Sequence, residues 1–507
     1  QFLYFIGEIS PNMRVASFAA AALLLLAAAT SAVSAAPSAD EVTSLPDMPG
    51  PMQSKHYSGY VKGTNGAQLH YYWVNAIDVA PSTAPVVLWT NGGPGCSSMD
   101  GWGYELGPFH FKNYNTSGAT FKYNEFTWAR IANVVFLENP PGVGFSYRPD
   151  GNYSIDDTIN AQDNLAGVKD LFASKFPEFA GNDFWIAGES YGGIYVPTLS
   201  RLVLNDAATF PGFKGMLVGN GVTSHTYDFN FYYSDAVFAH GHGFMTDAKL
   251  AEVKAACVPP AGNPNGAACT NLSDWYYTTM APNVNMYDYS GRCFVPPKTQ
   301  DLFIPALSRR IHAHARKLGV SAQEYIRLAQ KGDSLERLLA MKAGTPVPPS
   351  PQGFNVPCID SMTMTTYLNR ADVKQAIHVP LALDWAICAG ITYTDNILDV
   401  VSVYNDMIAA GKRVLIYNGN TDMSVPYTGT RAWIEHETTW AVSRELRGWS
   451  YNDPAFPYGP QQGGFATSYA NNSVWFTLVN GAGHMVPQFR PAAAYAMFER
   501  FLTGTGF

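Results

Sequence analysis

The fold of this chain is decided by residues 184–192, which read FWIAGESYG. The first four are a short, continuously apolar run, which is typical of a strand buried on both faces. Gly188 to Gly192 then match G-x-S-x-G, and a segment with helical periodicity, Tyr195–Leu204, follows. This order of strand, turn and helix predicts a sharp turn that presents the Ser190 hydroxyl beside a helix N-terminus, where developing negative charge is stabilised.

Similar runs on both sides of this stretch predict further strands. They are Gln68–Asn75, which alternates, and the apolar runs Val86–Trp89, Ala132–Leu137, Met216–Val218, Val414–Tyr417 and Val474–Val479. Helical patterns lie between several of them, at Ile159–Phe176, Val400–Ala410 and Ala492–Leu502. Because strands and helices alternate, we expect an α/β fold with a mostly parallel central sheet flanked by helices.

Residues 223–352 interrupt this alternation. They contain a basic helical segment, Ser308–Lys342, and then a proline-rich linker at 343–351 that cannot be helical. We interpret the block as a largely helical inserted cap with a protease-accessible linker. It would separate a first core part, 36–222, from a second, 353–507. The basic segment is better explained as a solvated helix face than as a binding patch.

Composition and charge restrict the possible functions. Hydrophobic residues make up 47% and charged residues 14% of the 507, so global disorder, collagen and coiled coil are excluded. The formal net charge of −8 gives no reason to expect a nucleic-acid partner. We therefore expect a soluble, well-packed enzyme.

The N-terminal region predicts the secretory pathway. Residues 13–35 combine one arginine, the apolar run Ala19–Ala29 and a small-residue end, which is typical of a signal peptide. The alternative is a buried helix or a membrane anchor, and residues 1–12 are interpreted as a non-native upstream extension. An even number of cysteines fits an oxidising compartment, so we expect an extracellular or vacuolar/lysosomal protein. Expected glycosylation sites are the sequons at Asn115, Asn152, Asn271 and Asn471.

A serine nucleophile needs a base, and the base needs an orienting carboxylate. In an α/β-hydrolase the acid and then the histidine follow the serine, each on a loop after a late strand. Asp422 ends the segment NGNTD after Val414–Tyr417, and His484 ends NGAGH after Val474–Val479. We therefore predict Ser190, Asp422 and His484 as a catalytic triad on an α/β-hydrolase fold.

Two glycine-rich segments also follow predicted strands. Residues 89–98, WTNGGPGCSS, have glycines that let backbone N–H groups approach a substrate oxygen, and residues 138–147 read ENPPGVGFSY. Neither contains a phosphate-loop or dinucleotide-binding motif, so we expect no cofactor. The pairs His240/His242 and His312/His314 are better explained as surface residues than as metal ligands, and no CxxC occurs, so no metal site is predicted.

These blocks, with GESYGG, YNGNTD and NGAGHMVP, resemble the serine carboxypeptidase family of α/β-hydrolases. The resemblance runs from about Leu45 to Phe507. It implies an enzyme that releases single amino acids from peptide C-termini through an acyl-enzyme intermediate. Ser190 would be the nucleophile, His484 the base and Asp422 its partner. The expected partners are peptide and protein C-termini, and the protein is expected to be a monomer or homodimer.

The resemblance also implies roles for the surrounding residues. The backbone N–H groups of Gly93 and Tyr191 would form an oxyanion hole, and Met485 would line the pocket for the departing residue. The substrate's terminal carboxylate would be bound by Asn91, Gly92, Glu105 and Glu189. Because crowded acids cannot all ionise, at least one glutamate must be protonated, and activity is expected to be favoured at acidic pH. Of the many possible cysteine pairings, the resemblance implies Cys96–Cys388, Cys257–Cys269 and Cys293–Cys358.

Three other classes of function fit the sequence less well. A related acyltransferase on the same fold would pass the acyl group to an alcohol, and the retained Asn91 and Glu189 favour the peptidase. An inactive binding protein would have lost a triad member. A plain esterase would have no use for two acids beside the nucleophile.

Overall fold

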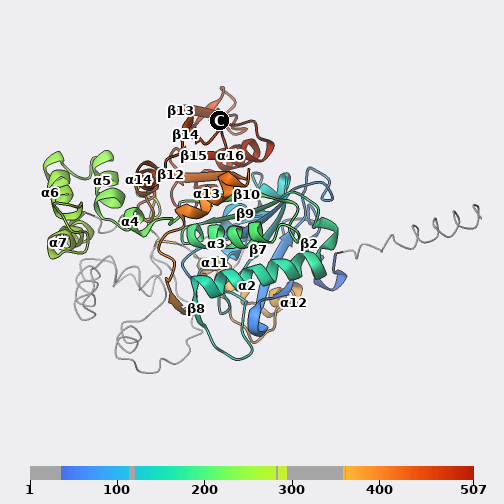
Figure 1. The fold of residues 1–507 in the computed structure, drawn as a ribbon. Helices are drawn as coiled ribbons and strands as arrows, with labels where there is room; N and C mark the ends of the chain where they lie inside the picture. Colours follow the sequence, from blue (N-terminus) through green and yellow to red (C-terminus); the bar gives the residue numbers. More distant parts are fainter. Residues whose placement is uncertain (1–35, 113–119, 281–283, 294–357, 360) are drawn as a thin grey trace, which may run out of the picture.

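The computed structural model describes residues 36–112, 120–280, 284–293, 358–359 and 361–507 (Figure 1). Several expected features lie outside the described residues. These are the upstream extension, the signal peptide, the sequon Asn115, the basic segment Ser308–Lys342 and the proline-rich linker 343–351. Within the described ranges, no helix has the length and apolarity needed to cross a membrane.

A mixed sheet of 11 strands forms the centre of the described chain, in the order β1-β2-β3-β7-β4-β9-β10-β12-β15-β14-β13. Its central strands are parallel: β7 (Asn133–Leu137), β4 (Val86–Thr90), β9 (Phe184–Glu189), β10 (Phe213–Gly219), β12 (Arg413–Gly419) and β15 (Val474–Val479). Both edges are antiparallel, with β1 (Glu41–Val42), β2 (His56–Lys62) and β3 (Gln68–Val74) on one side and β14 (Gln461–Tyr469) and β13 (Val442–Tyr451) on the other. Two small pairs lie apart from it, β5 (Phe109–Lys112) with β6 (Thr120–Tyr123) and β8 (Ser154–Asp156) with β11 (Thr392–Thr394).

Nearly every position of the central strands is buried, as their continuous apolar runs predict. Successive side chains enter two separate cores because strand side chains alternate between faces. In β12, for example, Val414 and Ile416 pack into one core, and Leu415 and Tyr417 pack into the other. The parallel centre is thus covered on both sides.

Helices provide that cover (Figure 1). One core includes residues of α2 (Asp157–Asp170), α3 (Gly192–Asn205), α13 (Val401–Ala409) and α14 (Tyr427–Glu437). The other includes residues of α11 (Met362–Leu368), α12 (Ala371–Ala376), α15 (Val486–Phe489) and α16 (Pro491–Thr503). A parallel sheet centre between helices confirms the predicted fold class.

The described part of the inserted block is helical. It contains α4 (His225–Asp228), α5 (Val237–Gly241), α6 (Asp247–Cys257) and α7 (Ala267–Trp275). These helices have an apolar cluster of their own, which includes Phe231, Val253 and Tyr276. Figure 1 shows α5, α6 and α7 grouped at one side of the sheet.

Three disulfides join the pairs that the resemblance implies. Cys257–Cys269 connects α6 to α7, and Cys293–Cys358 spans 65 positions of the sequence. Cys96 belongs to the glycine-rich loop that follows β4, and its disulfide joins this loop to Cys388, 292 positions along the chain.

Candidate active site

Ser190 lies on the sharp turn between β9 and α3, at the carboxyl end of the parallel strands. Its φ is +61°, in the left-handed region that residues other than glycine rarely adopt. Two hydrogen bonds hold the turn. The Ser190 N–H donates to the Gly219 carbonyl at 3.0 Å, and the Ser190 carbonyl accepts from the Val222 N–H at 3.0 Å. The turn is therefore fastened to the end of the neighbouring strand β10.

Close backbone contacts explain the glycines around Ser190. A Cβ on Gly193 would lie 2.2 Å from the Val222 carbonyl oxygen, and a Cβ on Gly92 would lie 2.3 Å from the Tyr191 nitrogen. The glycine-rich loop after β4 is thus in backbone contact with the turn that carries Ser190. This contact places Gly93 and Tyr191, the two expected oxyanion donors, on adjoining segments.

Asp422 and His484 meet although they follow different strands, β12 and β15. His484 Nδ1 lies 2.7 Å from Asp422 Oδ2, and the Asp422 side chain is fully buried. Asp422 Oδ2 also accepts from Asn220 Nδ2 at 2.7 Å, while the N–H of Ser424 donates to Oδ1 at 2.7 Å. The carboxylate is surrounded by donors, so it can hold the imidazole in one orientation.

One cavity of about 70 Å³ joins the predicted residues. Its walls are formed by Asn91, Gly92, Gly93, Cys96, Asp100, Glu189, Ser190, Tyr287, Ile359, Ile387, Cys388, Ser424, His484 and Met485. The hydrogen bonds among the described residues include none between the Ser190 hydroxyl and His484. Such bonds are often long before substrate binds.

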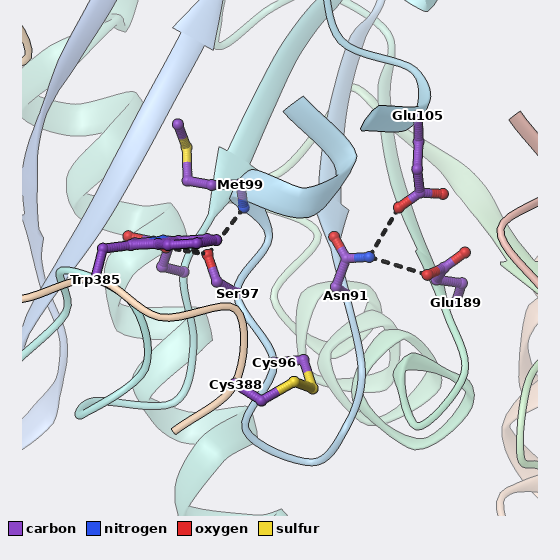
Figure 2. The surroundings of a disulfide bond; sticks show 9 residues. Asn91, Cys96, Ser97, Met99, Glu105, Glu189, Trp385 and Cys388 are labelled. Atoms are coloured by element: carbon purple, nitrogen blue, oxygen red, sulfur yellow. Dashed lines mark hydrogen bonds between the residues drawn. A yellow bond between two sulfur atoms is a disulfide. The ribbon is translucent and has the colours of Figure 1, made fainter. Parts of the chain in front are cut away.

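The predicted carboxylate-binding residues form a buried hydrogen-bonded group. Asn91 Nδ2 donates to Glu105 Oε1 at 2.9 Å and to Glu189 Oε1 at 3.0 Å (Figure 2). Asn91 Oδ1 accepts from Trp89 Nε1 at 2.8 Å and from the Gly101 N–H at 3.2 Å. Because both ends of the amide are bonded, its orientation is fixed.

Asp100 is a third buried acid in this group, and the sequence analysis missed it. Carboxylate oxygens of Asp100, Glu105 and Glu189 lie within 4.8 Å of one another. Burial raises the pKa of Glu105 to about 7. Burial, and then the neighbouring acids, raise the pKa values of Glu189 and Asp100 well above their ordinary range. The group therefore retains protons at acidic and near-neutral pH.

Among the described residues, these three acids are also the group whose ligand atoms lie close enough to share a metal ion. A metal would have to displace the protons that burial favours. Each acid already faces another acid or the Asn91 amide. Protonated acids therefore suit a hydrogen-bond acceptor better than a cation.

Asn220 and Tyr287 were also missed. Asn220 follows β10 in the segment VGNG, so its place at a strand end was the available signal. Tyr287 lies in the inserted block; its carbonyl accepts from the His484 N–H at 2.7 Å, and its ring meets the imidazole edge-on at 5.3 Å. No local pattern marks Tyr287, because its position depends on the insertion.

The chain is similar to known proteins over most of its length. The family model for serine carboxypeptidases matches residues 46–504. Serine carboxypeptidase-like 21 from Arabidopsis thaliana is 35% identical over 500 residues, covering 92% of this chain and 95% of that protein. The lysosomal protective protein from Mus musculus is 33% identical over 484 residues, covering 92% and 94%.

A solved structure shows the same fold. It is that of KEX1(delta)p, a prohormone-processing carboxypeptidase from Saccharomyces cerevisiae. Its TM-score is 0.64 at 16% identity, and the match covers 91% of this chain and 94% of that one.

Proposed function

This chain belongs to the serine carboxypeptidase family, and from that premise we propose that it releases single amino acids from peptide C-termini through an acyl-enzyme on Ser190. His484 accepts the proton of the Ser190 hydroxyl as the oxygen attacks the last peptide carbonyl. Asp422 keeps the imidazole oriented and stabilises the imidazolium. The same proton then passes to the departing amine, and water hydrolyses the acyl-enzyme by the reverse sequence.

The oxyanion of each tetrahedral intermediate is stabilised by the backbone N–H groups of Gly93 and Tyr191. Preorganised donors of this kind are effective because they need no rearrangement when charge develops. The backbone contact between Gly92 and Tyr191 supports this role, because it holds the two donor segments together.

The buried group of Asn91, Glu105 and Glu189 is the observation that carries the proposal. Asn91 and Glu189 line the Ser190 cavity, and Glu105 is hydrogen-bonded to the same Asn91 amide. This position suits a substrate whose free carboxylate lies one residue beyond the scissile bond. A protonated glutamate donates a hydrogen bond to that carboxylate, whereas an ionised one repels it. The reaction is therefore proposed to be favoured at acidic pH, and Met485 to contact the departing residue.

A panel of N-blocked dipeptides tests this function. We expect release of the free C-terminal amino acid, much slower cleavage of the matching C-terminal amides, and loss of activity in Ser190→Ala. A residual rate orders of magnitude below that of the parent enzyme is compatible with the oxyanion hole acting alone. Equal rates on acids and amides, or transfer to an added alcohol faster than hydrolysis, would overturn the proposal.

We further propose that the protein acts in the secretory pathway, outside the cell or in a vacuole or lysosome. The three disulfides support an oxidising compartment. The side chains of Asn152, Asn271 and Asn471 are exposed, as glycosylation requires. Peptide-N-glycosidase treatment of the protein from its natural source should lower its mass and convert occupied asparagines to aspartates. An unchanged mass would contradict glycosylation.

A further inference from the structure

A buried pair of ionisable side chains lies next to the glycine-rich loop and has no part in the mechanism above. His70, in β3, and Glu138, directly after β7, are both fully buried. His70 Nδ1 lies 2.8 Å from Glu138 Oε2. Burial of two such groups is costly unless they are paired and hydrogen-bonded, so their partners indicate what the pair holds in place.

The hydrogen bonds determine where the protons lie. The Ser58 hydroxyl donates its one hydrogen to the Ile377 carbonyl at 2.7 Å, so its oxygen accepts from His70 Nε2 at 2.9 Å. On the other side of the ring, Glu138 Oε2 already accepts from the Phe145 N–H at 2.8 Å. A proton therefore lies between His70 Nδ1 and Glu138 Oε2, and donors contact both oxygens of the carboxyl group.

The other carboxylate oxygen contacts two segments of the active site. Glu138 Oε1 accepts from the Ser97 hydroxyl and, at 3.0 Å, from Trp385 Nε1. Ser97 belongs to the loop Asn91–Asp100, and Trp385 precedes Cys388. Figure 2 shows Ser97 and Trp385 on one side of the Cys96–Cys388 bond and Asn91 with its two glutamates on the other.

Neighbouring bonds attach the same loop along its length. The Ser97 N–H donates to the Ile387 carbonyl at 2.7 Å, and the Ser98 hydroxyl donates to the Leu137 carbonyl at 2.6 Å. Asn139 Nδ2 donates to Thr90 Oγ1 at 2.7 Å. Glu138 lies in the middle of these contacts. Its neighbour Leu137 accepts a hydrogen bond from the loop, and its neighbour Asn139 donates one to the end of β4.

We propose that Glu138, held in place by its pairing with His70, is a positioning residue that holds the loop Asn91–Asp100 in its catalytic geometry. The inference rests on the proposed roles of Gly93 and Asn91 in that loop. Oxyanion donors act only when they are preorganised, and a shift of about 1 Å can cost on the order of a hundredfold in rate. Because Glu138 holds the loop, the Gly93 N–H and the Asn91 side-chain amide keep their positions.

Ser97→Ala tests the link while keeping both His70 and Glu138 in place. We expect kcat on a blocked dipeptide to fall at least about tenfold, since the loop loses a hydrogen bond to a buried carboxyl group. The matched control is Thr64→Val, which removes a hydroxyl donated to the buried Asp163 carboxylate between the β2–β3 turn and α2. Its kcat should change less than about twofold. Glu138→Gln should act like Ser97→Ala, with melting temperatures measured for all three variants.

The rate at which a fluorophosphonate labels Ser190 separates this inference from the carboxypeptidase proposal. Labelling builds negative charge in the oxyanion hole but needs no terminal carboxylate. Slower labelling in Ser97→Ala and Glu138→Gln, well below their melting temperatures, supports positioning even if the peptide panel fails. Parental kcat and parental labelling in both variants, with only the melting temperature lowered, would reduce the pair to a structural role and overturn the inference.

Discussion

Glu105 illustrates how the surroundings of one residue set the conditions for function. Burial raises its pKa to about 7, so its protonated form is lost as pH rises through that value. In the proposed mechanism, the protonated form donates a hydrogen bond to the substrate carboxylate. We expect KM for free-acid dipeptides to increase above about pH 7. An ionised glutamate about 4 Å from the substrate carboxylate would cost up to about 4 kcal/mol at an effective dielectric near 20.

The matched variants are Glu105→Gln and Glu189→Gln. An amide donates its hydrogen bond at any pH, so KM should depend less on pH in either variant. Peptide amides, which lack the carboxylate, should show little dependence even with the parent enzyme. If acids and amides gave the same pH profile of KM, the glutamates would have no role in binding the carboxylate.

Asn220 is expected to support catalysis through Asp422. It donates at 2.7 Å to the carboxylate oxygen that also contacts His484, and its φ of 38° is unusual for a residue with a side chain. Because a hydrogen bond to a charged group contributes about 1.5–3 kcal/mol, Asn220→Gly should lower kcat roughly tenfold or more. Glycine tolerates the backbone angle, so this variant separates the lost amide from strain. An unchanged kcat would show that the backbone donors suffice.

At the scale of elements, the turn between β9 and α3 depends on close packing against β10. We predict that Gly193→Ala is strongly destabilising, because its Cβ would lie 2.2 Å from the Val222 carbonyl oxygen. Overpacking typically costs about 1–3 kcal/mol, and a clash with backbone belongs at the upper end. Gly181→Ala is the control, since its Cβ meets nothing within 4 Å. Urea unfolding of the two variants should differ accordingly, and equal stabilities would contradict this packing.

The inserted block should tolerate a cut in its proline-rich linker. Residues 343–351 contain four prolines, and the disulfide between Cys293 and Cys358 joins the chain on either side of them. Limited proteolysis is expected to give two fragments that separate only after reduction, with activity retained. First cuts within Gly188–Leu204 would contradict the insertion.

For the whole molecule, the disulfides should differ in their effect on stability. Cys96–Cys388 spans 292 positions and Cys257–Cys269 spans 12. On the chain-entropy model the longer closure contributes about 5–6 kcal/mol and the shorter about 3 kcal/mol. Serine replacement of each pair should therefore reduce the free energy of unfolding unequally. Equal losses in denaturant titrations would argue against an entropic origin.

Prediction from sequence was successful where the signal was local and apolar. The central strands and the helices α2, α3, α13 and α16 lie where the runs and periodicities place them. Strand β13 was missed because most of its side chains are exposed and its pairing with β14 has register shifts. The alternation of strands and helices predicts parallel strands only. The antiparallel strands at both edges were therefore revealed by the structure.

The sequence by itself determined the turn at Ser190 and the order of serine, acid and histidine. Strand, turn and helix signals act over a few residues, and parallel strands bring their carboxyl ends to one edge. Only the tertiary structure placed Asp100 among the glutamates, Asn220 against Asp422, and Glu138 between His70 and Ser97. These contacts join residues from separate loops and strands. The raised pKa values of Asp100, Glu105 and Glu189 follow from burial, which no local sequence pattern encodes.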